Sequence, residues 1–236
     1  MFLKIENLEC RMASTDILRS CSLEVDNGEI VCLVGRNGAG KSSILKSIIG
    51  LYPSRTGKIF FNDRDITHLA IHQRVMAGIA YAPEDSRLFP ELSVEENIQL
   101  GFWVTGETER SGSFDLEKAF HIFPAIKKLI KRKADTLSGG EKKMVSISRA
   151  LALCPSLVLL DESLEGLSPL VVNAFSGAME SIRKDLGVSM LLAESNVHNA
   201  SQVAERAYII DRGEIIFEGR PSEILENEQL MKLVGK

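Results

Sequence analysis

A glycine-rich loop between an apolar run and a helix-like stretch constrains the fold of this chain more than any other feature. The loop, residues 35–42, has the form G-x-x-x-x-G-K-S. It follows the apolar run Ile30–Val34 and precedes Ser42–Ile49, whose apolar residues have helical spacing. In this strand–loop–helix order such a loop binds nucleotide phosphate, because its glycines let backbone N–H groups converge at the start of a helix. We therefore expect an α/β fold built around a phosphate-binding loop.

The polar side chains of this loop have separate predicted roles. Lys41 would add a positive charge beside the phosphates, and the hydroxyl of Ser42 would be a ligand of Mg²⁺. The alternative is an ordinary glycine-rich turn that opens a helix, and the flanking strand and helix disfavour it. The residues predicted to contact nucleotide in this segment are Gly35, Arg36, Asn37, Gly38, Ala39, Gly40, Lys41, Ser42 and Ser43.

Two adjacent carboxylates follow a second apolar run. Leu157–Leu160 is nearly all apolar, as in a strand buried on both faces of a parallel sheet, and Asp161 and Glu162 come directly after it. Because ligands of open α/β sheets bind at the carboxyl ends of the strands, we expect this pair beside the phosphate loop. Asp161 is suited to hold Mg²⁺, and Glu162 to orient or deprotonate the water that attacks a γ-phosphate.

Hydrophobic periodicity divides the chain into two kinds of structure. Alternating apolar residues predict short strands in the amino-terminal part, at Phe2–Leu8, Ser22–Val25, Ile30–Val34 and Lys58–Phe61. From Ser86 to Cys154 the spacing is helical, and the later segments predict strands at 157–160, 189–193, 207–210 and 214–217, a helix at 170–186 and a carboxy-terminal helix. We expect a single domain over residues 1–236, with an α/β core at 1–85 and 155–236 and a helical subdomain inserted at 86–154.

Composition narrows the classes of partner and compartment. A net charge of −4 argues against a nucleic-acid-binding surface, since phosphate backbones attract basic patches. No apolar stretch is long enough to span a bilayer, and Lys4 and Glu6 stand where a signal peptide needs an apolar region, so we expect a cytoplasmic protein. The four cysteines show no C-x-x-C spacing, which favours buried reduced thiols over disulfides or metal ligands.

A third motif supplies a family resemblance. Leu137-Ser138-Gly139-Gly140-Glu141 lies between the phosphate loop and Asp161-Glu162, and with these three motifs in this order the chain resembles the ATP-binding-cassette (ABC) ATPases over essentially its whole length. The resemblance implies a P-loop NTPase core with amino-terminal antiparallel strands and an inserted helical subdomain, with ATP and Mg²⁺ as cofactors. It also implies a head-to-tail dimer in which Ser138, Gly139 and Gly140 contact the γ-phosphate held by the opposing subunit. Ser138 could instead be only the N-cap of a helix, with Glu141 completing a capping box, and both can be true.

Longer matches indicate a subfamily. The segments 80–84 (A-Y-A-P-E), 87–90 (R-L-F-P), 92–97 (L-S-V-E-E-N) and 166–170 (G-L-S-P-L) are similar to the second ATPase subunit of importers for branched-chain amino acids and amides, and to the urea-importer branch. This implies a peripheral location on the cytoplasmic face of the membrane. It implies as partners transmembrane permease subunits, a second ABC ATPase subunit and, indirectly, a substrate-binding protein. A groove near Glu84 would receive a short helix of the permease.

The departures from the family pattern lie in the helper groups of the site. Glu84 stands where a Gln usually contacts Mg²⁺ and the attacking water, so its predicted roles are catalytic and metal-binding. Met12 falls where an aromatic residue usually stacks on adenine, and it can still offer a soft apolar surface. Ser168 and Ser163 replace a usual Asp and Pro. The largest departure is Ser195, at the position of the switch histidine that hydrogen-bonds the γ-phosphate.

These departures leave several hypotheses open. His198 would lie on the next helix, and we expect it to point elsewhere rather than replace the switch histidine. We expect the site built on Lys41 to hydrolyse ATP slowly, while the intact segment at Ser138 assists a partner ATPase. One alternative is a regulatory subunit that binds nucleotide without turning it over. Another is a cassette ATPase of a non-importing system, such as lipid export or cofactor assembly.

Overall fold

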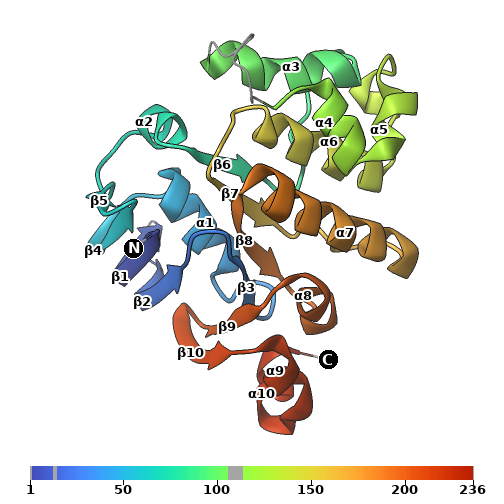
Figure 1. The fold of residues 1–236 in the computed structure, drawn as a ribbon. Coiled ribbons are helices and arrows are strands. Elements are labelled where there is room, and N and C mark those ends of the chain that lie inside the picture. The colour runs from blue at the N-terminus through green and yellow to red at the C-terminus, as the bar shows by residue number, and fades with distance from the viewer. Residues whose placement is uncertain (1, 13–14, 106–113, 236) are drawn as a thin grey trace.

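The strands of the chain form two sheets, and helix α1 (Lys41–Ile49) packs between them (Figure 1). The computed structural model describes residues 2–12, 15–105 and 114–235. Ile44, Leu45 and Ile48 of α1 are fully buried in a core cluster that also contains apolar residues of both sheets. The helix that follows the phosphate loop is therefore fixed from two sides.

The larger sheet has the strand order β10-β9-β3-β8-β7-β6, and only the pair β10 and β9 is antiparallel. Every residue of β3, β7 and β8 is buried, which explains their almost uninterrupted apolar sequences. Because these strands are parallel, the loops that leave their carboxyl ends meet at one edge of the sheet. The strands are β3 (Ile30–Val34), β6 (Ile79–Ala82), β7 (Leu157–Asp161), β8 (Ser189–Glu194), β9 (Arg206–Asp211) and β10 (Glu214–Gly219).

The smaller sheet is antiparallel and longer than the sequence pattern predicts. Its order is β2-β1-β4-β5, from β1 (Leu3–Met12), β2 (Thr15–Val25), β4 (Ser54–Phe61) and β5 (Arg64–Asp65). The pairing of β1 with β2 shifts register after Ile5, Leu8 and Cys10. Each shift interrupts the alternation of apolar and polar residues, so periodicity alone marks only the regular part of each strand.

Helices between β6 and β7 form the group at the top of Figure 1. The sequence predicts helical structure from Ser86, but Ser86 and Arg87 both have positive φ, at 58° and 42°, and the first helix starts at Val94, where Ser93 and Glu96 cap it through reciprocal hydrogen bonds. This arrangement confirms the predicted α/β class, with antiparallel amino-terminal strands and inserted helices. The inserted elements are α3 (Val94–Thr105), α4 (Leu116–Ile122), α5 (Pro124–Leu129), a 3₁₀ turn (Ala134–Thr136) and α6 (Gly139–Leu151), and α2 (Ile71–Met76) precedes β6.

The carboxy-terminal part contains two short helices where the sequence analysis predicts one. The side chain of Asn227 accepts hydrogen bonds from the N–H groups of Gln229 and Leu230 and so caps a second helix. This cap breaks the predicted helix at Asn227. The helices of this part are α7 (Pro169–Leu186), α8 (Val197–Val203), α9 (Pro221–Glu226) and α10 (Glu228–Val234).

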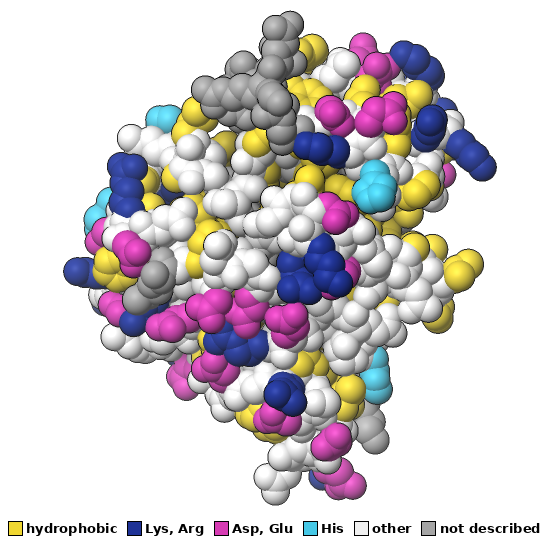
Figure 2. Space-filling view, viewed as in Figure 1, with side chains coloured by type: hydrophobic (Ala, Val, Ile, Leu, Met, Phe, Trp, Pro, Cys, Tyr) yellow, Lys and Arg dark blue, Asp and Glu magenta, His cyan; other side chains and the backbone are white. Residues whose placement is uncertain are grey.

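An arginine on β9 ties the two sheets together. Arg206 forms ion pairs with Glu29 at 2.7 Å and Glu218 at 2.6 Å, and it donates to the carbonyl of Glu24 on β2. On the face drawn in Figure 2, Lys and Arg side chains lie beside Asp and Glu side chains rather than in one extended basic area. Both signs of charge are therefore interspersed on this face.

The structure also shows how far each cysteine is buried and how long and apolar the described helices are. None of the four cysteines, all of which lie in the described part of the chain, forms a disulfide; Cys10, Cys21 and Cys32 are buried, and Cys154, expected to be buried, is half-buried. Burial raises the pKa of the Cys21 thiol to about 11, so it stays protonated at neutral pH. Within the residues that the structure describes, none of the helices combines the length and the apolar character needed to cross a bilayer.

Candidate nucleotide site

The loop between β3 and α1 requires glycine for two different reasons. A Cβ at Gly35 would lie 2.3 Å from the carbonyl oxygen of Ile210 on β9, a distance that no side chain tolerates. Gly40 has a φ of 117°, in the region that disfavours residues with a Cβ. The loop thus packs tightly on β9 and delivers the chain directly into α1, so it lies at the positive end of that helix.

Lys41, the first residue of α1, is only 4% exposed, and its ammonium contacts protein oxygens. Its Nζ donates to the carbonyl of Gly35 at 2.9 Å and to the hydroxyl of Ser195 at 3.0 Å. It also forms an ion pair with Glu162, with 3.0 Å between Nζ and Oε1, and both side chains are nearly inaccessible to solvent. A phosphate that binds Lys41 must therefore compete with these oxygens.

Ser42 and Asp161, both expected from the sequence to be ligands of Mg²⁺, lie in direct contact. The hydroxyl of Ser42 donates to Oδ1 of Asp161 at 2.6 Å, and the hydroxyl of Tyr81 donates to Oδ2 at 2.7 Å. Burial and the neighbouring Asp161 charge raise the pKa of Tyr81, so Tyr81 remains a donor. A hydroxyl and a carboxylate are hard oxygen donors of the kind that Mg²⁺ prefers, so this pair fits that ion.

Glu162 is held in an unusual backbone conformation. Its φ is 47°, in the left-handed region, and its N–H donates to the carbonyl of Ala193 on β8 at 2.9 Å. Its own carbonyl accepts from Nζ of Lys143 on α6 at 2.5 Å. A non-glycine residue keeps such a conformation only where its surroundings over-determine it, and such residues often lie at functional sites.

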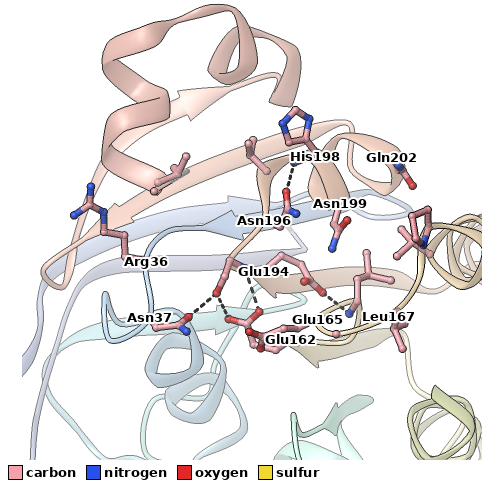
Figure 3. Close-up of a pocket in the computed structure, with 18 of the residues that line it drawn as sticks. Arg36, Asn37, Glu162, Glu165, Leu167, Glu194, Asn196, His198, Asn199 and Gln202 are labelled. Atoms are coloured by element: carbon pink, nitrogen blue, oxygen red, sulfur yellow. Dashed lines mark hydrogen bonds between the residues drawn. The ribbon is translucent and has the colours of Figure 1, made fainter. Parts of the chain in front are cut away.

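Ser195, the first residue after β8, connects three groups of the site. Its hydroxyl lies 2.7 Å from Oε1 of Glu162, 2.7 Å from Oδ1 of Asn37 and 3.0 Å from Nζ of Lys41. Its N–H donates to Oε2 of Glu162 at 3.1 Å. His198, one turn later on α8, points away from Glu162 in Figure 3. Ser195, which stands at the switch-histidine position, therefore contacts the predicted general base Glu162 directly.

A cavity of about 560 Å³ collects most of these groups. Lys41 and Ser42 line it together with Glu84 and Glu162, so the structure places Glu84 beside the phosphate loop, where the sequence analysis expects it. A larger cavity of about 920 Å³ adjoins it, lined by Asn37, Glu162 and Ser195 among others (Figure 3). The predicted catalytic and metal-binding residues thus converge on one region.

Two sets of predicted site residues are not among the described residues that line these cavities. The side chain of Met12 is not among the described side chains, so its predicted contact with adenine stays a prediction. Ser138 caps α6: its hydroxyl accepts from the N–H of Glu141, and its own N–H donates to Oε2 of Glu141 at 2.7 Å. Among the described residues, Ser138, Gly139 and Gly140 line neither cavity. The capping box is therefore formed, and the tip of α6 is left for another role.

Three residues near the site escaped the sequence analysis. Tyr81 and Lys143 contact it through hydrogen bonds between segments distant in sequence. Glu194, the last residue of β8, is fully buried; Oε1 accepts from Leu164 N–H at 2.9 Å, and Oε2 has no hydrogen-bond partner among the residues that the structure describes. Burial raises the pKa of Glu194 to about 8, so it is largely protonated at neutral pH. Only the position of Glu194 at the end of an apolar run signals its burial in the sequence.

Known proteins match both the sequence and this fold. A family model described as ABC transporter matches residues 18–165. The chain belongs to the ABC transporter ATP-binding family. The resemblance inferred from the three motifs is thereby confirmed, and this ABC ATPase chain is an ATP-binding subunit of a transporter. Subunits of this kind dimerise and work with transmembrane permease subunits.

Relatives of this ABC chain fall into more than one transport system. It is 36% identical to the probable branched-chain amino acid transport ATP-binding protein LivF of Archaeoglobus fulgidus, over 92% of this chain and 91% of that protein. It is 35% identical to the lipopolysaccharide export system ATP-binding protein LptB of Escherichia coli K12, over 98% of this chain and 95% of that protein. A crystal structure of a nucleotide-free ATP-binding cassette from an ABC transporter superposes with a TM-score of 0.85 at 25% identity, covering 100% of this chain and 99% of the other.

Proposed function

We propose that this chain is the ATP-hydrolysing subunit of an uptake transporter for branched-chain amino acids or related small polar solutes. The observation that carries the ATPase proposal is the convergence of Lys41, Ser42, Asp161 and Glu162 at one edge of the larger sheet. The proposed solute class rests on the 36% identity with LivF and on the importer-like segments of the sequence. The chain would act at the cytoplasmic face of the membrane, beneath permease subunits. A substrate-binding protein would deliver the solute to these permease subunits.

The residues of the site divide the work of hydrolysis between them. The loop N–H groups and Lys41 would hold the phosphates, and Ser42 and Asp161 would hold Mg²⁺, with Glu84 facing the same cavity. Bound Mg²⁺ neutralises charge on the phosphate oxygens. Glu162 would accept a proton from the attacking water.

The ion pair between Lys41 and Glu162 would make phosphate binding by Lys41 precede the activation of water by Glu162. When Lys41 turns to phosphate, Glu162 loses a strong charge-assisted partner, and its carboxylate is then available to water. Ser195 would keep one hydrogen bond to Glu162 throughout. A serine hydroxyl is neutral and shorter than an imidazole, so we propose that the site turns over slowly.

The tip of α6 would act on a second cassette. We propose that residues 86–154 form a helical subdomain that presents Ser138, Gly139 and Gly140 to the γ-phosphate bound by the opposing subunit. A Cβ added at Gly139 meets none of the described residues within 4 Å, so this tip is open to a close approach from their side. ATP would close the two cassettes and hydrolysis would let them separate, with Met12 beside the adenine.

The test is single-turnover hydrolysis of Mg-ATP by the full-length chain with its partner ATPase. We expect Glu162→Gln to abolish hydrolysis at this chain's own site while the nucleotide still binds. Heterodimers with one site altered at a time then compare the two sites. Equal losses from Glu162→Gln here and from the matching change in the partner would defeat the asymmetric version. Nucleotide binding with no hydrolysis at all would favour the regulatory subunit instead.

A second candidate function is export of a lipid, because the identity with LptB is almost the same and spans 98% of this chain. The two candidates differ in their partners. An importer requires genes for a substrate-binding protein and paired permeases next to this one, whereas an exporter does not require a binding protein. Co-purification of the tagged chain from its own host membranes, followed by mass spectrometry, would show which set accompanies it.

A further inference from the structure

The cavity beside the phosphate loop carries more negative than positive side chains. Glu84, Glu162 and Glu165 line it, and among its described lining residues Lys41 alone is basic. A nucleotide triphosphate adds further negative charge to the same space. Carboxylates that lie close to one another and to phosphate repel each other and the phosphate. This repulsion disfavours the ionised carboxylates unless another cation compensates.

Lys143 brings a second cation to this region from α6, called the signature helix below because it begins within the motif at residues 137–141. Its side chain leaves α6 and donates from Nζ to the carbonyls of Glu162 at 2.5 Å and Glu165 at 2.7 Å. The two carbonyls belong to the turn that follows β7, so the ammonium bridges the ends of this turn. Lys143 is half-buried there and is separated from Glu162 by 19 positions in the sequence.

The surroundings of Lys143 are acidic on all sides that the site presents. The carboxyl groups of Glu194, Glu165, Glu162 and Glu84 lie near its ammonium. Burial lowers the pKa of Lys143, and the carboxylates of Glu165, Glu162 and Glu84 act against that change by favouring the charged lysine, while the largely protonated Glu194 contributes little at neutral pH. The lysine therefore balances desolvation against the charge of the same groups that line the cavity.

The contact with Glu162 also bears on its backbone. Glu162 has a φ of 47°, its N–H is bonded to Ala193 and its carbonyl to Lys143. Both backbone polar groups of the predicted general base are thus fixed, one by the sheet and one by α6. Removal of the Lys143 contact releases one of the two hydrogen bonds that fix the backbone of Glu162, from which the carboxylate extends.

We propose that Lys143 is a positioning residue of the ATPase site: it holds the turn Glu162–Glu165 from the signature helix, and its charge offsets the carboxylates of Glu84 and Glu165. The inference rests on the proposed function, because it assigns Lys143 to the hydrolysis that Glu162 performs. It predicts that loss of Lys143 affects the rate of hydrolysis more than the affinity for nucleotide.

The experiment compares variants of the full-length chain in single-turnover hydrolysis of Mg-ATP and in binding of a fluorescent ATP analogue. We expect Lys143→Met to slow hydrolysis by about tenfold, the worth of a charge-assisted hydrogen bond. The dissociation constant should change by less than about threefold, because Lys143 does not line the phosphate cavity. Lys143→Arg should restore most of the rate. The matched control is Lys142→Met, one position earlier on α6.

A second arm tests the charge. In the Lys143→Met background, Glu84→Gln should recover about threefold or more of the lost rate, since it removes one of the carboxylates that Lys143 offsets. If Lys143→Met does not fold, Lys143→Gln provides the same comparison with a side chain that still donates a hydrogen bond. A rate within twofold of the wild type, or a loss that Glu84→Gln does not relieve, overturns the proposal.

The outcome also separates this inference from the proposed function. A wild-type chain that hydrolyses ATP, together with an equally active Lys143→Met variant, overturns only the role of Lys143. A wild-type chain that shows no Glu162-dependent hydrolysis, alone or with its partner ATPase, overturns both.

Discussion

Among single residues, Ser195 lies where the predicted phosphate-binding lysine, Lys41, meets the predicted general base, Glu162. Its hydroxyl contacts Lys41, Asn37 and Glu162, and its N–H holds the second oxygen of Glu162. An imidazole at this position would extend further from the loop after β8 and carry an N–H donor at its end. The short serine side chain therefore hydrogen-bonds Glu162, the predicted general base. A longer donor at the same position could reach the phosphate instead.

Ser195→His should accelerate single-turnover hydrolysis, by about tenfold if the imidazole donates to charge that develops on the γ-phosphate. The measurement is the rate of phosphate release after mixing the full-length chain and its partner with Mg-ATP. Ser201→His, at an exposed position of α8, is the control and should leave the rate unchanged. No acceleration would mean that the slow turnover we propose has another origin.

The buried carboxyl of Glu194 makes stability depend on pH. Its pKa rises from 4.5 to about 8 in the folded chain, because burial disfavours the carboxylate. Between these values the folded state binds more protons at this group than the unfolded state, so its contribution to stability falls as pH rises. We expect Glu194→Gln to flatten the decline of the free energy of unfolding between pH 5 and 8, as measured by urea titration at each pH. Parallel pH profiles for the variant and the wild type would contradict this.

Among the elements, α6 supports the surroundings of the site at two places. Lys143 reaches the turn after β7, and Arg149 reaches the loop after β6, donating to the carbonyls of Ser86 and Arg87 at 2.8 Å each. Both Ser86 and Arg87 have positive φ, so this loop follows a path that few residues adopt without support. Helix α6 thus holds the loop that follows Glu84 as well as the turn that starts at Glu162.

Arg149→Met should destabilise the chain by about 1–3 kcal/mol, because two carbonyls lose a charged donor. The effect should be strongest locally, as faster amide hydrogen exchange over residues 84–90. Lys128→Met, at an exposed position of α5, is a suitable control. Exchange that increases equally throughout the chain would show that Arg149 supports the fold in general rather than this loop.

Local patterns predict the phosphate loop, the carboxylate pair and the buried parallel strands, because each depends on residues that are consecutive in the sequence. The contacts of Lys143 and Tyr81 depend instead on which segments the fold brings together, 19 and 80 positions apart. A lysine on a helix looks solvent-exposed in sequence, and only the packing of α6 against the turn after β7 gives Lys143 its partners. The extent of β1 and β2 was underestimated for a related reason, since register shifts remove the alternation that marks a strand.

At the scale of the whole molecule, the two halves of the proposed ATP site lie on different parts of the chain. Lys41, Ser42 and Glu162 meet at the edge of the larger sheet, while Ser138 caps α6 and, among the described residues, does not line their cavity. In the proposed arrangement, one copy would therefore hold the phosphates without its own Ser138 segment. A second cassette placed head to tail would bring that segment to the phosphates and complete both sites at once.

Ser138→Arg should spare nucleotide binding and block ATP-driven association. Each subunit binds ATP through its own loop, but the arginine adds bulk at a helix tip that must approach a γ-phosphate closely. The experiment is sedimentation velocity with Mg-ATP in the Glu162→Gln background, where slow hydrolysis preserves the ATP-bound form. Ala125→Arg, at an exposed position of α5, adds the same charge away from the tip and should still dimerise. If Ser138→Arg chains associate normally with ATP, the γ-phosphate is not enclosed by this segment, and the closure of the dimer must depend on other contacts.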